Sequence, residues 1–255
     1  MWWFQQGLSI LPSVLVVWTS ASFIFSYVTA VLLHHVDPLM PYISDTGTVP
    51  PESCLFGIMV NISALLGTAT IYVRYKQVLS LNPEDSIILK LNKAGLVLGM
   101  VSCFGICIIA NVQKSALIVI HVIGGHLAFG VGIFYILVQT ILSYKLPHGS
   151  KVVFRIRLMV LLWCTVSIVS MLISSVILRS SQYGADVMLK MHWDPNDKGY
   201  GLHIMNTVSE WSLGFSFTSF FLTYIHDFQK ITLYVLVLDG HSVNYTNPQF
   251  TTDEP

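Results

Sequence analysis

The chain has 255 residues, of which 54% are hydrophobic and only 10% are charged, with a mean hydropathy of +0.68. Soluble domains carry about 25% charged residues, so there is too little charge here to cover the surface of a soluble enzyme. Thirteen basic residues balance thirteen acidic ones without any basic block, so nucleic acid is not an expected partner. The composition predicts an integral membrane protein, with the lipid bilayer as its partner.

Six apolar stretches are long enough to cross a bilayer, which requires roughly 20 predominantly apolar residues in a helix. In chain order they are residues 8–33, 54–73, 94–110, 116–142, 158–178 and 205–225. The predicted fold class is therefore an all-α polytopic membrane protein with a six-transmembrane-helix bundle.

The third span is short, but its helix should begin earlier in the chain. Residues 82–85, Asn-Pro-Glu-Asp, are typical of a helix start, with a cap, a proline in the first turn and acidic residues at the positive end of the helix dipole. Lys90 and Lys93 would then extend from one continuous helix into the lipid headgroups.

The orientation is predicted from the basic residues, which concentrate on the cytosolic side of membrane proteins. The connections at residues 74–93 and 143–157, together with the termini, carry nine Lys and Arg, whereas the other connections carry four. Both termini are therefore expected in the cytosol. The chain divides into a six-span domain, residues 1–230, and a short cytosolic tail, residues 231–255.

Small residues recur at every fourth position on two successive spans: Gly95, Gly99 and Cys103 on the third, and Gly124, Ala128 and Gly132 on the fourth. Such faces let membrane helices approach closely. Packing within the chain is the favoured interpretation, and dimerisation through one of the faces is the alternative. The sequence leaves the oligomeric state open.

Few polar residues fall inside the predicted spans, and an ionisable group there is a functional hypothesis by default. The candidates are Glu210, Asn206, Asn61, His121 and His126. For Glu210, a carboxylate that reaches luminal water or binds a neighbouring helix is the favoured interpretation, and a proton or substrate role is the alternative. His121 and His126 are five positions apart and point in different directions from one helix, so they cannot hold one metal ion together.

Neither a catalytic site nor a cofactor is predicted. Nucleophile-elbow, zinc-protease and phosphate-loop motifs are all absent from the sequence. The four cysteines are too scattered for a disulfide framework or a zinc site. A haem-binding electron carrier, with histidine pairs between helices, is a minor hypothesis without a supporting spacing.

The first luminal loop, residues 34–52, contains the most specific polar segment of the chain. Its candidate functional residues are Pro41, Tyr42, Ser44, Asp45 and Gly47. The prolines favour extended backbone, and the later residues are typical of a turn. We expect a rigid loop that folds over the helix ends.

Residues 41–47, Pro-Tyr-Ile-Ser-Asp-Thr-Gly, resemble the signature of the Frag/DRAM/Sfk family of six-span membrane proteins. Residues 72–76, 110–113, 210–211 and 221–230 resemble the same family. The resemblance covers about residues 1–232, which is nearly every span and loop.

The resemblance implies a non-enzymatic regulator in lysosomal and endosomal membranes, and also the plasma membrane, that promotes autophagy and stress-linked cell death. Autophagy or lysosomal membrane proteins are the implied partners, and the family offers no catalytic residues to carry over. The alternative is a transporter or lipid-handling protein with a polar site around Glu210. That alternative predicts that Glu210, Asn206 and Asn61 converge on a cavity inside the bundle.

The tail after Ile231 departs from the family pattern. Tyr234 and Val237 form a tyrosine sorting motif, a tyrosine followed after two residues by a bulky apolar residue. Such short motifs occur often by chance, so the lysosomal location is implied by the family more than by this motif.

Overall fold

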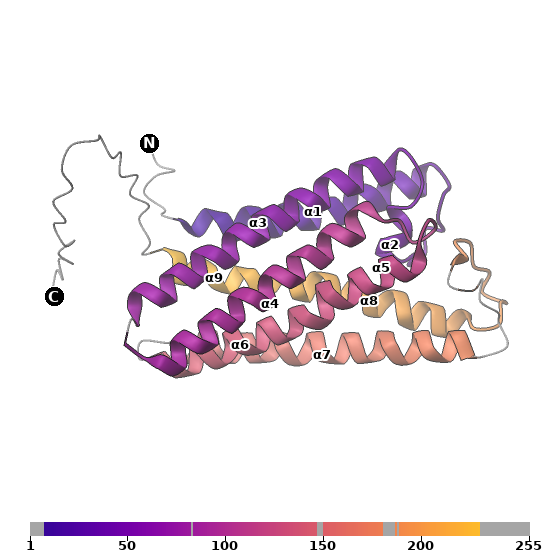
Figure 1. The fold of residues 1–255 in the computed structure, drawn as a ribbon. Helices are drawn as coiled ribbons and strands as arrows, with labels where there is room; N and C mark the ends of the chain where they lie inside the picture. Colours follow the sequence, from indigo (N-terminus) through magenta and orange to yellow (C-terminus); the bar gives the residue numbers. More distant parts are fainter. Residues whose placement is uncertain (1–7, 83, 147–149, 181–186, 188, 230–255) are drawn as a thin grey trace, which may run out of the picture.

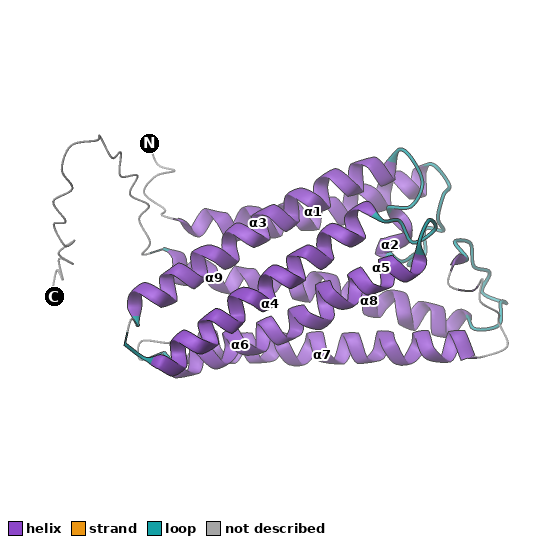
Figure 2. Ribbon diagram, in the orientation of Figure 1, coloured by secondary structure: helices purple, strands orange, loops and turns teal. Residues whose placement is uncertain are grey.

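The computed structural model describes residues 8–82, 84–146, 150–180, 187 and 189–229. Within these residues it is helical and contains no strand, and the long helices lie side by side in one elongated bundle (Figures 1 and 2). The predicted all-α class is confirmed.

Nine α-helices of the described chain build the bundle and its caps, joined by two helical segments of other types. They are α1 (Ile10–Leu32), α2 (Ile43–Thr46), α3 (Glu52–Leu81), α4 (Ser86–Asn111), α5 (Ile118–Gly125), a π-helical segment (His126–Val131), α6 (Gly132–Lys145), α7 (Lys151–Ser180), α8 (Tyr200–Phe220), a 3-10 turn (Phe221–Thr223) and α9 (Tyr224–Phe228), the α-helix at the end of the described chain. α5, the π-helical segment and α6 form one continuous helix.

The helices close into a ring. α1 packs on α3, α3 on α4, α4 on the continuous α5–α6 helix, α6 on α7, α7 on α8, and α8 returns to α1. The short α2 lies at one end of the bundle, where it contacts α1 and α8, and α9 lies near the opposite end (Figure 1). This arrangement gives the bundle an interior that side chains from every long helix can reach.

Five of the described helical stretches are long and apolar enough to cross a membrane: Ile10–Leu32, Glu52–Leu81, Ser86–Asn111, Ile118–Lys145 and Lys151–Ser180. The chain is thus a multi-pass membrane protein. α8 has 21 residues and packs along α7, but it is not one of the five. Its polar residues, including His203, Asn206 and Glu210, lower its hydropathy.

Several helices extend well beyond the predicted spans, and this corrects two predicted connections. α3 continues to Leu81, and α7 already begins at Lys151, because a helix can continue through the headgroup region where its residues are no longer apolar. Arg74 and Arg157, predicted to lie in cytosolic connections, are on these helices. Both are buried, with 3% and 1% of their surface exposed.

The start of α4 was predicted three residues too early. Its cap is Asp85, whose carboxylate accepts hydrogen bonds from the backbone nitrogens of Ile87 and Ile88 at 2.9 and 3.0 Å. The helix is then continuous to Asn111, so Lys90 and Lys93 lie on it as predicted. Asp85, predicted to lie in the first turn, is therefore the cap itself.

Both small-residue faces lie inside the bundle, which supports packing within the chain. A Cβ atom on Gly99 would lie 2.9 Å from Ile71 of α3, and one on Gly95 would lie 2.9 Å from Gln139 of α6. The closest backbone approach involves Gly105, which lies outside the predicted small-residue spacing. A Cβ atom there would lie 2.7 Å from the Gly124 carbonyl oxygen.

Candidate functional site

The signature loop, which comprises residues 41–47, is tied to α8 by two hydrogen bonds. The backbone nitrogen of Ile43 donates to the Glu210 carboxylate at 2.9 Å, and the Trp211 indole nitrogen donates to the Pro41 carbonyl at 2.8 Å. The Glu210 carboxylate therefore binds the loop backbone. This contact connects two sequence segments that are 167 positions apart.

A buried ion pair holds the same loop against the α4–α5 connection. The Lys114 ammonium lies 2.7 Å from the Asp45 carboxylate and 4.2 Å from the centre of the Tyr42 ring. Burial raises the pKa of Asp45 above its ordinary value, and the pairing with Lys114 opposes this rise. In the sequence Lys114 is recognisable only as a basic residue of a loop, and its place as a lone lysine in so short a connection is the one local signal of its role.

Two further contacts fix the end of the loop. The hydroxyls of Thr46 and Ser26 of α1 are 3.0 Å apart. Gly47 does not supply a left-handed turn, since its φ is −109°. It is required for space, because a Cβ atom there would lie 2.5 Å from the Phe56 ring. These contacts hold the end of the loop against α1 and α3.

Beneath the loop the bundle contains a cavity of about 380 Å³. Glu210 and Asn206 contribute to its wall, together with Tyr42, Ser44 and Lys114 at the same end. The rest of the wall is mainly apolar side chains of α1, α3, α4, α5, α7 and α8. A polar end and a long apolar body are the features that suit an amphipathic ligand.

Asn61 does not join this site, so of the three polar residues predicted to converge only Glu210 and Asn206 line the cavity. Its side chain exchanges two 3.0 Å hydrogen bonds with Asn111 and also donates to the Gly57 carbonyl at 2.8 Å. It therefore connects α3 to the end of α4. The pairing explains how an amide is accommodated near the end of two apolar helices.

The two histidines contribute to the cavity wall from α5 and the π-helical segment. The Nδ1 atom of His121 lies 2.7 Å from the Val112 carbonyl oxygen, and that of His126 lies 2.7 Å from the Val122 carbonyl oxygen. Within the described residues, no group of three or more His, Cys, Asp or Glu is placed to hold a metal ion.

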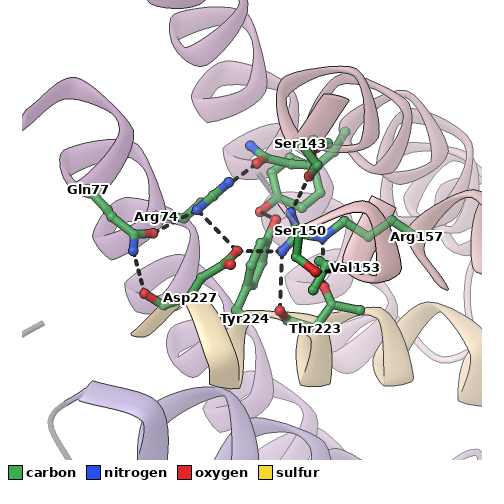
Figure 3. Close-up of polar contacts among 11 residues, drawn as sticks. Arg74, Gln77, Ser143, Ser150, Val153, Arg157, Thr223, Tyr224 and Asp227 are labelled. Carbon is green, nitrogen blue, oxygen red and sulfur yellow. Dashed lines mark hydrogen bonds and ion pairs between the residues drawn. The ribbon is translucent and has the colours of Figure 1, made fainter. Parts of the chain in front are cut away.

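At the opposite end of the bundle, two arginines share one carboxylate (Figure 3). Asp227 of α9 lies 3.1 Å from the Arg74 guanidinium of α3 and 2.6 Å from the Arg157 guanidinium of α7. Gln77 also binds α9, donating to the Asp227 carbonyl at 2.5 Å. We call Arg74, Arg157 and Asp227 the arginine clasp.

Hydrogen bonds and aromatic rings complete the arginine clasp. Arg157 donates to the hydroxyls of Thr223, at 2.9 Å, and of Ser143. The Tyr224 ring lies 4.8 Å from the Arg157 guanidinium carbon (Figure 3). The Tyr224 hydroxyl is 2.7 Å from the hydroxyl of Tyr135. The cluster was not predicted, because in the sequence its three charged residues look like ordinary basic and acidic residues outside the spans.

Replacing Lys114 with methionine should lower the free energy of unfolding by about 2 kcal/mol at neutral pH, since Asp45 loses its ion-pair partner in the interior. The loss should shrink toward acidic pH. In the folded state the pKa of Asp45 is raised above its unfolded value, about 3.9. The folded state therefore binds more protons than the unfolded state, and the free energy of unfolding falls as pH rises through the folded pKa.

Thermal unfolding of the purified Lys114→Met protein in detergent, from neutral pH to about pH 5, checks this. The difference in unfolding temperature between the Lys114→Met protein and the unchanged protein should become smaller toward acidic pH. A difference that stays constant over this range would contradict the buried charge of Asp45 as the cause.

Comparison with known proteins gives a consistent result over nearly the whole chain. The family model described as the Frag1/DRAM/Sfk1/Cwh43P N-terminal domain matches residues 7–231. DNA damage-regulated autophagy modulator protein 2 of Rattus norvegicus is 62% identical over 100% of this chain and 96% of its own length. DNA damage-regulated autophagy modulator protein 1 of Homo sapiens is 42% identical over 90% of this chain and 94% of its own. No solved structure matches.

Proposed function

The chain belongs to the Frag1/DRAM/Sfk1/Cwh43P family, and from this membership we propose that it is a non-enzymatic membrane regulator that promotes autophagy. Its place of action is the lysosomal and endosomal membrane, with the plasma membrane as a further location, and its activity extends to stress-linked cell death. The similarity to relatives named autophagy modulators along 90–100% of the chain carries the proposal. Its partners are autophagy or lysosomal membrane proteins.

The proposed topology has six spans, with α8 as the sixth, and both termini in the cytosol. The excess of basic residues on the side of the termini, nine against four, supports this orientation. The six-span domain is then residues 1–230, followed by the tail of residues 231–255. The signature loop and α2 face the lumen.

The proposed functional surface is the signature loop in the position that its hydrogen bond to Glu210 fixes. The loop is fixed by buried contacts from α1, α4–α5 and α8, more than a simple connection between two helices needs. A fixed luminal loop presents one constant surface to a partner, which reduces the entropy lost on binding.

A Glu210→Gln variant should fold but restore little autophagic flux in cells that lack the protein. Glutamine keeps an oxygen that can accept from the Ile43 nitrogen, whereas it removes the negative charge. Flux is measured by lysosome-dependent turnover of autophagosome cargo, at matched expression and with imaging of location. Glu84→Gln, which removes an exposed carboxylate, is the matched control and should restore flux fully. Normal flux with a stable Glu210→Gln protein would contradict a functional role for this carboxylate.

The location is tested by the same imaging with Tyr234→Ala. Tyr234 and Val237 lie outside the described residues, so the motif remains a sequence-based hypothesis. Full-length protein in lysosomal membranes and a Tyr234→Ala protein held at the cell surface would support both the location and the signal. Full-length protein confined to the plasma membrane, with unchanged flux, would overturn the autophagy proposal.

Lipid handling, or transport, is the second candidate function. The cavity favours it, since Glu210 and Asn206 lie together in its wall. This candidate does not depend on the autophagic-flux experiment, and it is tested by measuring lipid binding to the chain.

A further inference from the structure

We propose that the cavity binds one neutral lipid that carries a hydroxyl group, of the sterol or diacylglycerol class, with the hydroxyl against Asn206. This inference rests on the second candidate function, lipid handling. It does not depend on the role in autophagy.

The apolar body of the cavity fits the hydrocarbon part of such a lipid. Its volume of about 380 Å³ falls within the range of small-molecule sites, about 300–1,000 Å³. Phenylalanine and aliphatic side chains from several helices form most of the wall, among them Phe23, Val60, Phe129, Leu172, Leu213 and Phe217. An apolar ligand replaces the dispersion contacts that these side chains lack when the space is empty.

Asn206 supplies the second observation, an acceptor without a partner. Its amide nitrogen donates to the Ser175 hydroxyl at 2.7 Å, but its side-chain oxygen is buried and has no hydrogen-bond partner within the described residues. The residue is 1% exposed and contributes to the cavity wall. Because an unpaired buried acceptor is costly, a ligand hydroxyl that donates to it would be favoured.

The charges around the polar end select a neutral head over an anionic one. Lys114 is already compensated by Asp45, and Glu210 adds a second carboxyl group nearby. A negatively charged headgroup at this place would lie near two carboxylates and only one ammonium group, which is electrostatically unfavourable. Arg179 also contributes to the wall, but it is exposed at the rim, where solvent or headgroups can screen its charge.

Exposed residues in the cavity wall indicate an opening between α5 and α7. His126 of the π-helical segment and Val176 and Arg179 of α7 contribute to the wall and are exposed. α6 packs on α7, whereas α5 is not packed closely on α7 in the described part of the chain. An opening on the flank of a membrane bundle admits a ligand from the bilayer, which is where such lipids reside.

Gly125 offers a way to fill the cavity without a clash. It contributes to the wall, and a Cβ atom placed on it would meet no atom within 4 Å. Gly130 has equally free space but does not contribute to the wall. Gly125→Leu is therefore the test variant, Gly130→Leu the matched control, and Asn206→Leu the variant that removes the acceptor.

The experiment uses the purified full chain in phosphatidylcholine nanodiscs that contain photoreactive sterol, diacylglycerol or phosphatidylserine probes. We expect the sterol or the diacylglycerol probe to label the chain saturably and to be displaced by the same unlabelled lipid. Gly125→Leu should weaken this labelling about tenfold, the equivalent of losing two buried methylene groups, and Asn206→Leu should also weaken it. Gly130→Leu should label like the unchanged chain.

The proposal is overturned if labelling is unaffected by Gly125→Leu, or if the phosphatidylserine probe is preferred over both neutral probes. It also fails if neither neutral probe labels the chain saturably. These outcomes are separate from those of the autophagy proposal. A chain that binds no neutral lipid but restores flux refutes only this inference, whereas a chain that binds lipid but does not restore flux refutes only the autophagy role.

Discussion

An Asp227→Asn protein should lose about 3 kcal/mol of its free energy of unfolding, because two buried arginines would lose the carboxylate that they share. The side chains of Arg74 and Arg157 are 4% and 1% exposed, and Asp227 bonds both. Removing one partner of a buried ion pair leaves an uncompensated charge in a medium of low dielectric constant. In the arginine clasp the change leaves two such charges, near enough to repel each other.

Thermal unfolding of the purified protein in detergent measures this loss, and the yield of folded protein gives an independent reading. Arg74→Leu is an informative comparison, since Asp227 then keeps Arg157 and the loss should be smaller. Glu84→Gln removes an exposed carboxylate and should change stability by less than about 0.5 kcal/mol. An Asp227→Asn protein as stable as the Glu84→Gln protein would show that the arginine clasp does not stabilise the fold.

A Gly105→Ala protein should also be destabilised by about 3 kcal/mol, the upper end of the usual range for overpacking. The added methyl group would lie 2.7 Å from the carbonyl oxygen of Gly124 and closer still to the backbone nitrogen of Ala128. Backbone atoms cannot rotate away as a side chain can. The two helices would have to separate along the whole contact, with loss of the 2.6 Å hydrogen bond from Ser102 to the Ala128 carbonyl.

The control is Gly130→Ala, the same substitution on the π-helical segment where a Cβ atom has no neighbour within 4 Å. It should be neutral or stabilising by up to about 1 kcal/mol, since alanine favours helical backbone over glycine. Gly124→Leu should be destabilising too, but part of its clash is with the flexible side chain of Ile108. Equal stability of the Gly105→Ala and Gly130→Ala proteins would contradict the close helix contact.

The sequence predicted those parts of the fold that depend on apolar length and on small residues. Long apolar runs gave the five helices that can cross a membrane, and the spacing of Gly124 and Ala128 identified a face that packs closely. The exact contact could not be predicted, because Gly105 falls outside the regular spacing on its own helix. Helix ends were also missed, since hydropathy measures the thickness of the apolar layer rather than the length of the helix.

The candidate site was predictable only as a set of separate residues. Glu210 and the loop around Tyr42 and Asp45 were identified from residue type and position in the chain. That Glu210 binds the loop backbone depends on contact between α2 and α8, which no local pattern encodes. Lys114 was missed although its place in a short connection was a local signal, because its burial depends on a partner 69 positions away.

The arginine clasp also constrains the order in which the chain can be completed. Arg74 and Arg157 are made early and in the middle of synthesis, whereas Asp227 lies on α9, the last helix of the described chain. Until that helix arrives, both guanidinium groups lack their carboxylate and cannot be buried at low cost. A nascent chain that stalls or terminates before α9 would therefore expose two unneutralised arginines at the membrane, a feature by which quality-control machinery could distinguish an unfinished molecule from a finished one.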